Sequence, residues 1–166
     1  MRKSKAAVGT SVFFAVAPGV VAGLVPWLLT DWVVRGPDTW PLLRLAGLFL
    51  FAGGAGALVG AFVRFVVEGL GTPAPVAPTE HLVVGGLYRY VRNPMYVAVV
   101  ATIIGQALLF RQPVLFVWAG LVAAAVASFV HLYEEPTLSR RYGAEYDEYR
   151  DAVPRWLPRP RGPGRS

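Results

Sequence analysis

The chain has 166 residues, of which 55% are hydrophobic and only 16% are charged, and its formal net charge is +6. Soluble domains usually carry about 25% charged residues, so this chain has too few of them to cover a water-soluble globule. The composition therefore excludes an ordinary soluble enzyme, a disordered chain and a coiled coil, and it predicts a small all-α membrane protein with several spans. The chain contains no cysteine, which excludes a disulfide, a thiolate metal site and a cysteine nucleophile.

Four charge-free stretches predict a helical bundle of four membrane spans. A helix needs about 20 residues to cross a hydrocarbon core of about 30 Å, so the third stretch is short. Only Arg111 separates the third stretch from the fourth, and this spacing predicts that the last two spans form a tight antiparallel hairpin. The stretches cover residues 6–30, 45–63, 95–110 and 112–130.

The distribution of basic residues predicts the orientation of these spans. With four spans, all of the 16 Lys and Arg residues except Arg35, Arg44 and Arg111 fall on one side, which by the positive-inside rule is the cytoplasm. Both termini are then cytoplasmic in a protein of the cell membrane. The same bias accounts for the high net charge, so no nucleic-acid partner is expected. The apolar run after the basic start continues to Leu29, which favours an uncleaved anchor over a secretory signal.

Glycines in the second span invite two interpretations. Gly54, Gly56 and Gly60 do not fit the dinucleotide-binding fingerprint, because their spacing differs and no strand precedes them. Ala52, Gly56 and Gly60 lie four residues apart, however, and small residues at this spacing let membrane helices approach closely. We therefore expect these three residues to form a helix-packing face.

The connection between the second and third spans concentrates hydrogen-bonding side chains. Three prolines in residues 69–81 favour an extended path, and Gly85 with Gly86 permits a sharp turn close to a ligand. Pro94 fits the first turn of the third helix, whose free backbone N–H groups face this connection. Composition alone fits a lipid-headgroup anchor as well as a ligand site. The polar side chains are Tyr88, Arg89, Tyr90, Arg92, Asn93 and Tyr96.

Polar and amphipathic residues follow the fourth span. The adjacent acids Glu134 and Glu135 stand at the predicted membrane edge, where charge is costly unless it is solvated or used. Tyrosines then recur at helical spacing between charged residues, which predicts a cytoplasmic amphipathic helix at the interface, broken at Gly143. Residues 159–166 consist mainly of Pro, Arg and Gly and are predicted to be disordered.

Five of these pieces, in this order, resemble the integral-membrane methyltransferases. That superfamily includes the isoprenylcysteine carboxyl methyltransferases and the phospholipid methyltransferases. The similarity covers about residues 60–158, so we expect one domain over residues 1–166, with N-terminal spans in 1–60 and a cofactor-binding and catalytic core in 61–158. The pieces are GTPAP at 71–75, Leu82-Val83, GLYRYVRNPMY at 86–96, Glu134-Glu135 and YGAEYDEYRDAVPR at 142–155.

The resemblance implies a cofactor, an acceptor and a set of site residues. S-adenosylmethionine would be the methyl donor, bound at the cytoplasmic face, and a lipid-like or prenylated acceptor would enter from the bilayer. No metal ion is implied. The cofactor-binding residues would be Leu82, Val83, Gly86, Leu87, Tyr88, Asn93, Pro94, Met95, Tyr96 and Glu134. The catalytic residues would be Arg92, Glu134 and Glu135.

The residue types suit methyl transfer but leave the acceptor open. Positioning and exclusion of water are the means that such a site has. A carboxylate or thiolate acceptor is already nucleophilic, whereas an ammonium must lose a proton, for which His81, His131 and a glutamate are the local candidates. The isoprenylcysteine enzymes carry an arginine where this chain has Val130 and usually a histidine where it has Asn93. The missing arginine weakens a carboxylate acceptor. The function expected from the resemblance is an isoprenylcysteine carboxyl methyltransferase-like transfer to a lipid-like or isoprenoid acceptor, with a phospholipid amine or a thiol as the alternative on the same scaffold.

A non-catalytic membrane protein that binds anionic lipid or a partner through its basic segments is an alternative of another class. Such a protein needs positive charge, but it does not need Tyr88, the Asn93-Pro94 pair and the two adjacent acids together. The sequence therefore favours the enzyme. It makes no prediction about the oligomeric state.

Overall fold

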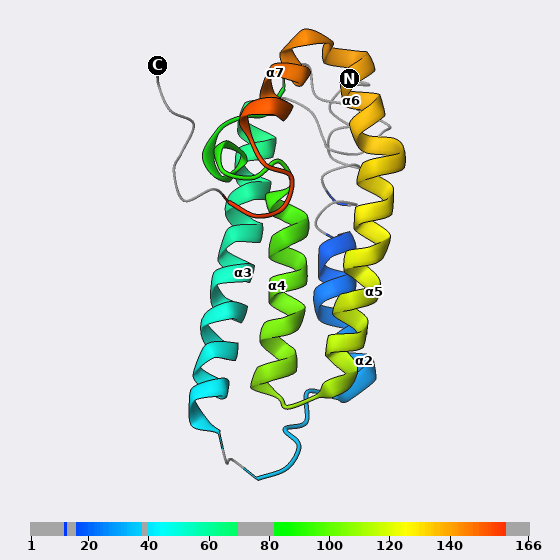
Figure 1. The fold of residues 1–166 in the computed structure, drawn as a ribbon. Coiled ribbons are helices and arrows are strands. Elements are labelled where there is room, and N and C mark those ends of the chain that lie inside the picture. Colours follow the sequence, from blue (N-terminus) through cyan, green and yellow to red (C-terminus); the bar gives the residue numbers. More distant parts are fainter. Residues whose placement is uncertain (1–11, 13–15, 38–39, 70–81, 159–166) are drawn as a thin grey trace.

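The computed structural model is helical throughout the part of the chain that it describes, and no strand occurs there (Figure 1). The predicted all-α fold is confirmed for these residues. His81, the three prolines near it and the predicted disordered tail lie outside the described residues. The structure describes residues 12, 16–37, 40–69 and 82–158.

Three long helices make up most of the bundle. Shorter elements extend them at both ends of the chain. The long helices are α3 (Pro41–Gly69), α4 (Pro94–Leu109) and α5 (Pro113–Phe129). The shorter elements are the π-helix η1 (Val20–Leu24), α2 (Val25–Thr30), the 3₁₀-helix η2 (Gly86–Arg89), the π-helix η3 (Val130–Glu134), α6 (Glu135–Tyr142) and α7 (Ala144–Ala152).

Two helices in the described part of the chain are long and apolar enough to cross a membrane, Pro41–Arg64 and Pro113–Tyr142. Only 17% and 22% of their most apolar 18-residue windows are buried, so most of their apolar side chains face outward, which suits lipid better than a soluble core. The helices Val16–Thr30 and Pro94–Leu109 are apolar but shorter. The four-span topology and its orientation therefore stay predictions.

Helices α3 and α4 pack closely because glycines let their backbones approach. A Cβ atom at Gly105 would lie 2.5 Å from the backbone nitrogen of Phe51, and one at Gly47 would lie 2.7 Å from the backbone nitrogen of Leu109. Real Cβ atoms do not come so near, so a side chain at either position would push the two helices apart. Gly54 on the same face of α3 approaches α4 in the same way.

The predicted packing face of α3 is wrong. Ala52, Gly56 and Gly60 are exposed, and a Cβ atom at either glycine would meet nothing within 4 Å. Small residues occur around much of this helix, and spacing alone does not say which of them meets a partner. The partner's own small residue, Gly105 of α4, selects the face that contains Gly47 and Gly54.

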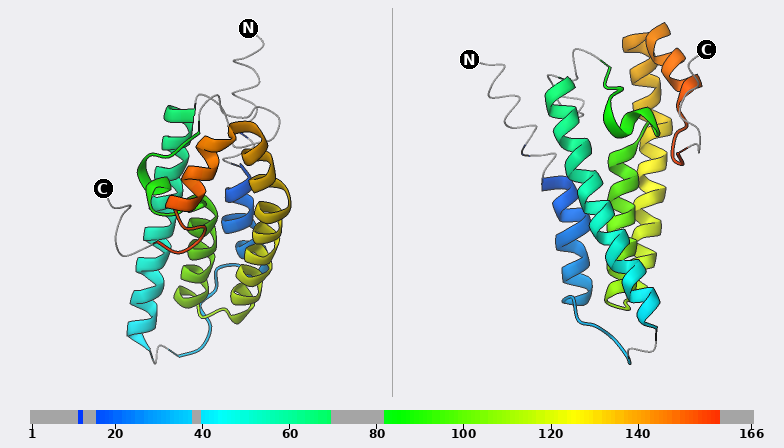
Figure 2. Two further views of the ribbon diagram at one scale, coloured as in Figure 1. Left: turned by 45° about the horizontal axis from the view of Figure 1, so that its top comes forward. Right: turned by 90° about the vertical axis from the view of Figure 1, so that its left-hand side faces the viewer.

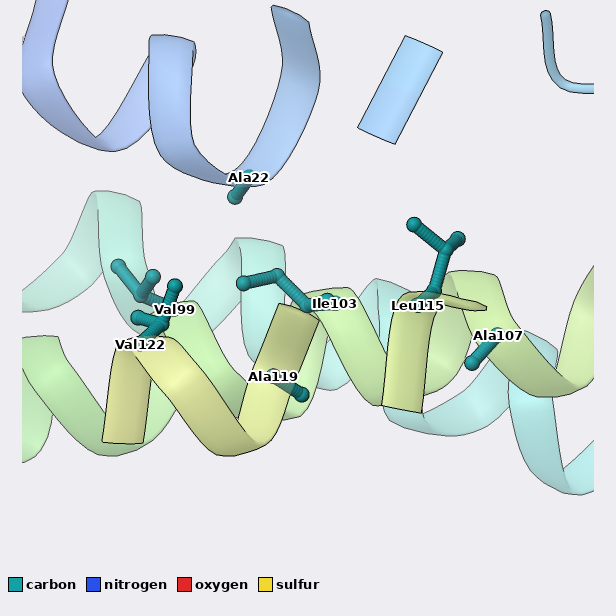
Figure 3. Packing of buried hydrophobic residues seen from close by; sticks show 7 residues of the cluster. All are labelled: Ala22, Val99, Ile103, Ala107, Leu115, Ala119 and Val122. Atoms are coloured by element: carbon teal, nitrogen blue, oxygen red, sulfur yellow. The ribbon is translucent and has the colours of Figure 1, made fainter. Parts of the chain in front are cut away.

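The apolar core lies between α4, α5 and the helix Val16–Thr30, which contains η1 and α2 and is here called the N-terminal helix (Figure 3). Ile103 of α4 and Leu115 of α5 are fully buried in it. Side chains of α4 and α5 also reach the π turn η1: the Gln106 Nε2 donates to the Ala22 carbonyl at 2.6 Å, and the Trp118 Nε1 donates to the Val21 carbonyl at 2.9 Å. These bonds attach the N-terminal helix to the bundle.

The two helices that were predicted to form a hairpin do so. Helix α4 ends at Leu109 and α5 begins at Pro113, and the two run antiparallel side by side (Figure 1). Arg111 adopts a left-handed φ of 52° in the turn, and the backbone N–H of Gln112 donates to the Ala107 carbonyl at 3.0 Å. Pro113 suits the first turn of α5, where its missing N–H has no partner to lose.

Helix α5 continues through η3 into α6, and the chain then turns back over the end of the bundle (Figure 1). Gly143, with φ of 55°, separates α6 from α7, so the predicted break at this residue is confirmed. Two short helices thus stand where one interrupted amphipathic helix was expected. After α7, residues 153–158, here called the C-terminal segment, return toward the start of α4 (Figure 2).

Candidate functional site

The start of α4, the turn around η2, the π turn η3 and the C-terminal segment come together at one end of the bundle (Figure 2). Of the polar side chains singled out in the sequence, Arg92, Asn93, Tyr96, Glu134 and Glu135 form hydrogen bonds there, whereas Arg89 and Tyr90 are exposed. Pro94 begins α4 and is buried beside Asn93. The first turn of α4 therefore presents its side chains to the other three elements.

A tyrosine and an acid form the central contact. The Tyr96 hydroxyl, in the first turn of α4, donates to Oε2 of Glu134 at 2.9 Å. Glu134 is the last residue of η3. A π turn contains one more residue than an α-turn and so rotates everything after it by about 100°. The π turn thereby decides that Glu134, and not a neighbour, faces α4.

Tyr88 is buried close to this pair. It lies in η2 and packs with Ala61, Val83 and Met95. Burial, together with the negative charge of Glu134, raises the pKa of the Tyr88 hydroxyl well above the ordinary tyrosine value. Tyr88 is therefore neutral at physiological pH. The site thus combines a carboxylate with two protonated tyrosines.

Glu135 is held by two arginines. The Arg92 Nη1 donates to its Oε1 at 2.9 Å, and the Arg155 Nε and Nη2 donate to its Oε1 and Oε2 at 2.9 and 2.6 Å. The Arg155 contact is bidentate, the stronger geometry for a guanidinium with a carboxylate. Arg92 also donates to the Tyr146 hydroxyl at 3.3 Å. The adjacent acids therefore have different partners.

The C-terminal segment is attached to the turn before α4 by backbone contacts. The Arg92 amide donates to the Pro154 carbonyl at 2.9 Å, and the Asn93 Nδ2 donates to the Arg155 carbonyl at 3.2 Å. The Tyr149 hydroxyl of α7 donates to the Tyr88 carbonyl at 2.7 Å. These bonds place α7 and the C-terminal segment across the polar end of the bundle.

Two tyrosines of α7 are shielded from water by this arrangement. Burial raises the pKa of Tyr149 above its usual value, although the positive charge of Arg92 opposes this shift. Burial and the charge of Glu135 likewise raise the pKa of Tyr146, again against the effect of Arg92. Both hydroxyls therefore stay protonated at neutral pH and keep their hydrogen bonds.

The remaining predicted cofactor residues lie around the same turn. Val83 and Met95 are buried in the cluster with Tyr88, and Leu82 is half-buried. Gly86 has a left-handed φ of 58°, and a Cβ atom there would lie 3.1 Å from the Arg64 side chain, so a larger residue would be strained. Leu87 is more exposed than the others.

Sequence reasoning missed three residues of the site. The sequence places Tyr146 and Tyr149 in an amphipathic helix at the interface and gives them no role in the site, whereas Tyr146 is buried and bound to Arg92, and Tyr149 is bound to the backbone of η2. Arg155 was given no individual role. Their helical spacing shows that the two tyrosines share a face, but only the turn at Gly143 shows that this face points inward.

The side-chain chemistry fits a cationic ligand that carries hydroxyls. A carboxylate such as Glu134 can accept hydrogen bonds from ribose hydroxyls or an ammonium, and tyrosine rings attract a cation through their faces. Within the residues that the structure describes, no group of three or more His, Asp or Glu side chains lies close enough together to hold a metal ion.

Comparison with known families agrees with this geometry. The family model of phospholipid methyltransferases matches residues 42–145. The match runs from the start of α3 into α7 and contains Tyr88, Tyr96 and Glu134, whereas the C-terminal segment lies beyond it. The comparison with curated proteins finds no match to the chain.

Proposed function

Because the chain belongs to the phospholipid methyltransferase family, we propose that it transfers a methyl group from S-adenosylmethionine to a lipid-like or isoprenoid acceptor at the cytoplasmic face of the cell membrane. The observation that carries this proposal is the hydrogen bond between Tyr96 and Glu134 beside the buried Tyr88. These three residues lie in the part of the chain that the family model matches.

The donor supplies a methyl group on a positively charged sulfur. The bond between that carbon and sulfur breaks as the bond between the carbon and the acceptor forms, and sulfur keeps the electron pair. Glu134 would bind ribose hydroxyls or the donor's ammonium, and the rings of Tyr88 and Tyr96 would face the cation. Because the charge on sulfur disappears during transfer, a water-poor site favours the reaction.

Arg92 and Glu135 fit a positioning role better than a chemical one. The Glu135 carboxylate is neutralised by two guanidinium groups, so it is a poor proton acceptor. Its bonds join the turn before α4 to the C-terminal segment, which would cover the bound donor and exclude water. In this proposal Glu134 contacts the cofactor, and Glu135 holds the C-terminal segment in place over it.

The acceptor is chosen among a lipid amine, a thiol and an isoprenylcysteine carboxylate. Val130, which stands where the isoprenylcysteine enzymes have an arginine, is 1% exposed and offers no charge to a carboxylate. This weighs against a carboxylate and leaves a thiol or an amine, and the amine's proton would leave to a base or to water before transfer. His131, the residue that follows Val130, is exposed. Radiolabelled donor offered with phosphatidylethanolamine vesicles, a long-chain thiol or a farnesylated cysteine peptide separates the three.

Calorimetry of the full chain in detergent tests the donor site. S-adenosylmethionine and S-adenosylhomocysteine should both bind, and Glu134→Gln and Tyr96→Phe should weaken binding. Glu148→Gln is the matched control, because Glu148 is an exposed acid of α7. If the folded wild-type protein binds neither ligand but does bind anionic vesicles, the chain is a lipid-binding protein and the proposal is wrong.

A further inference from the structure

A cavity of about 540 Å³ lies between the N-terminal helix, α3 and α4, within the size range of small-molecule sites. Its walls are largely apolar. Of the described residues that line it, Trp32, Thr102 and Gln106 carry a nitrogen or oxygen in the side chain. It shares Met95 with the site described above, since Met95 also packs against Tyr88.

The polar groups of the wall are already bonded within the protein. The Thr102 hydroxyl donates to the Ala98 carbonyl at 2.7 Å. The Gln106 amide accepts from the Trp32 Nε1 at 3.1 Å and donates to the Ala22 carbonyl at 2.6 Å. An occupant therefore meets apolar surface and satisfied polar groups, which suits a hydrocarbon better than a sugar or an ion.

The cavity is elongated and has two different ends. Its lining along α4 extends from Met95 to Phe110, a rise of about 22 Å in an α-helix. Met95, next to Tyr96 in the chain, marks the end near the polar site. Trp32, hydrogen-bonded to Gln106, stands at the other end. An elongated apolar cavity of this kind fits one extended chain better than a compact molecule.

We propose that this cavity binds one apolar chain of the methyl acceptor, and that the hydrogen-bonded pair of Trp32 and Gln106 closes its far end and limits the length of chain that fits. The inference rests on the proposed methyl transfer, because the shared Met95 is what connects the chain to a reacting head group at the Tyr96–Glu134 pair.

Two glycines provide a matched pair of variants. Gly23 lines the cavity on the side of Ala22, near the Gln106 end, and Gly120 lies exposed on α5 outside the lining. A Cβ atom at either glycine would meet nothing within 4 Å, so a side chain can start at both positions without moving the backbone. Gly23→Leu shortens the cavity, whereas Gly120→Leu leaves it unchanged.

Native mass spectrometry of the full chain in detergent tests the inference without catalysis. The probes are lysophosphatidylethanolamines with single saturated chains of increasing length. Wild type should retain one lipid up to a limiting length, and Gly23→Leu should lower that limit and weaken binding of longer chains on the order of tenfold, the effect of about two methylenes that lose their place. Trp32→Ala should raise the limit. Gly120→Leu should match wild type.

The outcomes separate this inference from the proposed function. If lipid is methylated but the limiting length is the same in Gly23→Leu, Trp32→Ala and wild type, the inference is overturned and the methyltransferase stands. If Gly120→Leu changes the limit as much as Gly23→Leu does, the cavity is likewise not the chain site. If Gly23→Leu retains less lipid than wild type but the wild-type protein binds no S-adenosylmethionine, both the acceptor assignment and the proposed function are overturned.

Discussion

Replacing Glu135 with glutamine distinguishes a positioning acid from a reacting one. In the wild-type protein the Glu135 side chain is 13% exposed and the Arg92 side chain 9% exposed, with 2.9 Å between their bonded atoms. Arg155 completes the group from the C-terminal segment and is 36% exposed. The glutamine keeps the size and one acceptor oxygen but removes the charge.

The exposures decide the size of the effect. Removing one partner of a buried ion pair costs about 3–5 kcal/mol, because the other charge is left uncompensated. Glutamine still accepts one hydrogen bond from Arg92, so we expect a loss of about 2–3 kcal/mol. Arg155→Gln should cost less, about 1 kcal/mol, because its partly exposed charge is screened by water.

Thermal unfolding of the detergent-purified protein measures this difference. In a chain of this size each kcal/mol shifts Tm by about 2–4 °C, so Glu135→Gln should lower it by about 4–12 °C. Arg150→Gln is the control, because its pair with Asp147 is half exposed and should contribute little. A Tm for Glu135→Gln equal to that of Arg150→Gln, with methyl transfer abolished, would show that Glu135 is catalytic and refute the reasoning.

Three further predictions concern the donor pocket, the helix contact and the response to alkali. Tyr96→Phe removes the hydrogen bond that holds the Glu134 carboxylate in place. That bond exists without the donor, so only part of its about 1.5–3 kcal/mol enters the donor affinity, and calorimetry should show an affinity lower by about threefold to tenfold. Gly105→Ala should lower Tm by forcing α3 and α4 apart, at about 1–3 kcal/mol, whereas Gly56→Ala on the open face should leave Tm unchanged or higher. Burial raises the pKa of Tyr149 in the folded state, whereas in the unfolded chain this hydroxyl ionises near pH 10. The stability that the neutral Tyr149 contributes is therefore complete below about pH 10 and is lost as the pH rises further. Between pH 9 and 11 the Tm of Tyr149→Phe should accordingly fall less than the Tm of the wild type.

The sequence predicts the helices well because long charge-free stretches alternate with short stretches that contain the charged residues. Long charge-free stretches, the lone Arg111 between two of them, and Gly143 within a charged helical pattern each correspond to an observed helix, turn or break. These are local signals. The face of α3 that meets α4 is not local, since Gly105 on the partner helix selects it, and the sequence-based assignment to Gly56 was wrong for that reason.

The π turns are the feature of this fold that sequence reasoning overlooked, although each leaves a trace. Both η1 and η3 are followed within two residues by a proline, Pro26 and Pro136. A proline inside an α-helix clashes with the carbonyl four residues earlier and lacks the N–H to bond it, and a wider turn just before it relieves both problems. At both places in this chain the helix continues past the proline by way of a π turn and does not end there.

The position of η3 explains how two adjacent acids come to do different work. Consecutive helical residues point about 100° apart, so one carboxylate of the pair faces α4 and the other faces the two arginines. Glu135 has its charge balanced by Arg92 and Arg155, whereas Glu134 accepts its hydrogen bond from a tyrosine hydroxyl. A cation that enters this end of the bundle therefore finds its counter-charge at Glu134. Glu134→Gln should accordingly weaken a sulfonium ligand more than its neutral thioether product, and equal loss for both would contradict this assignment.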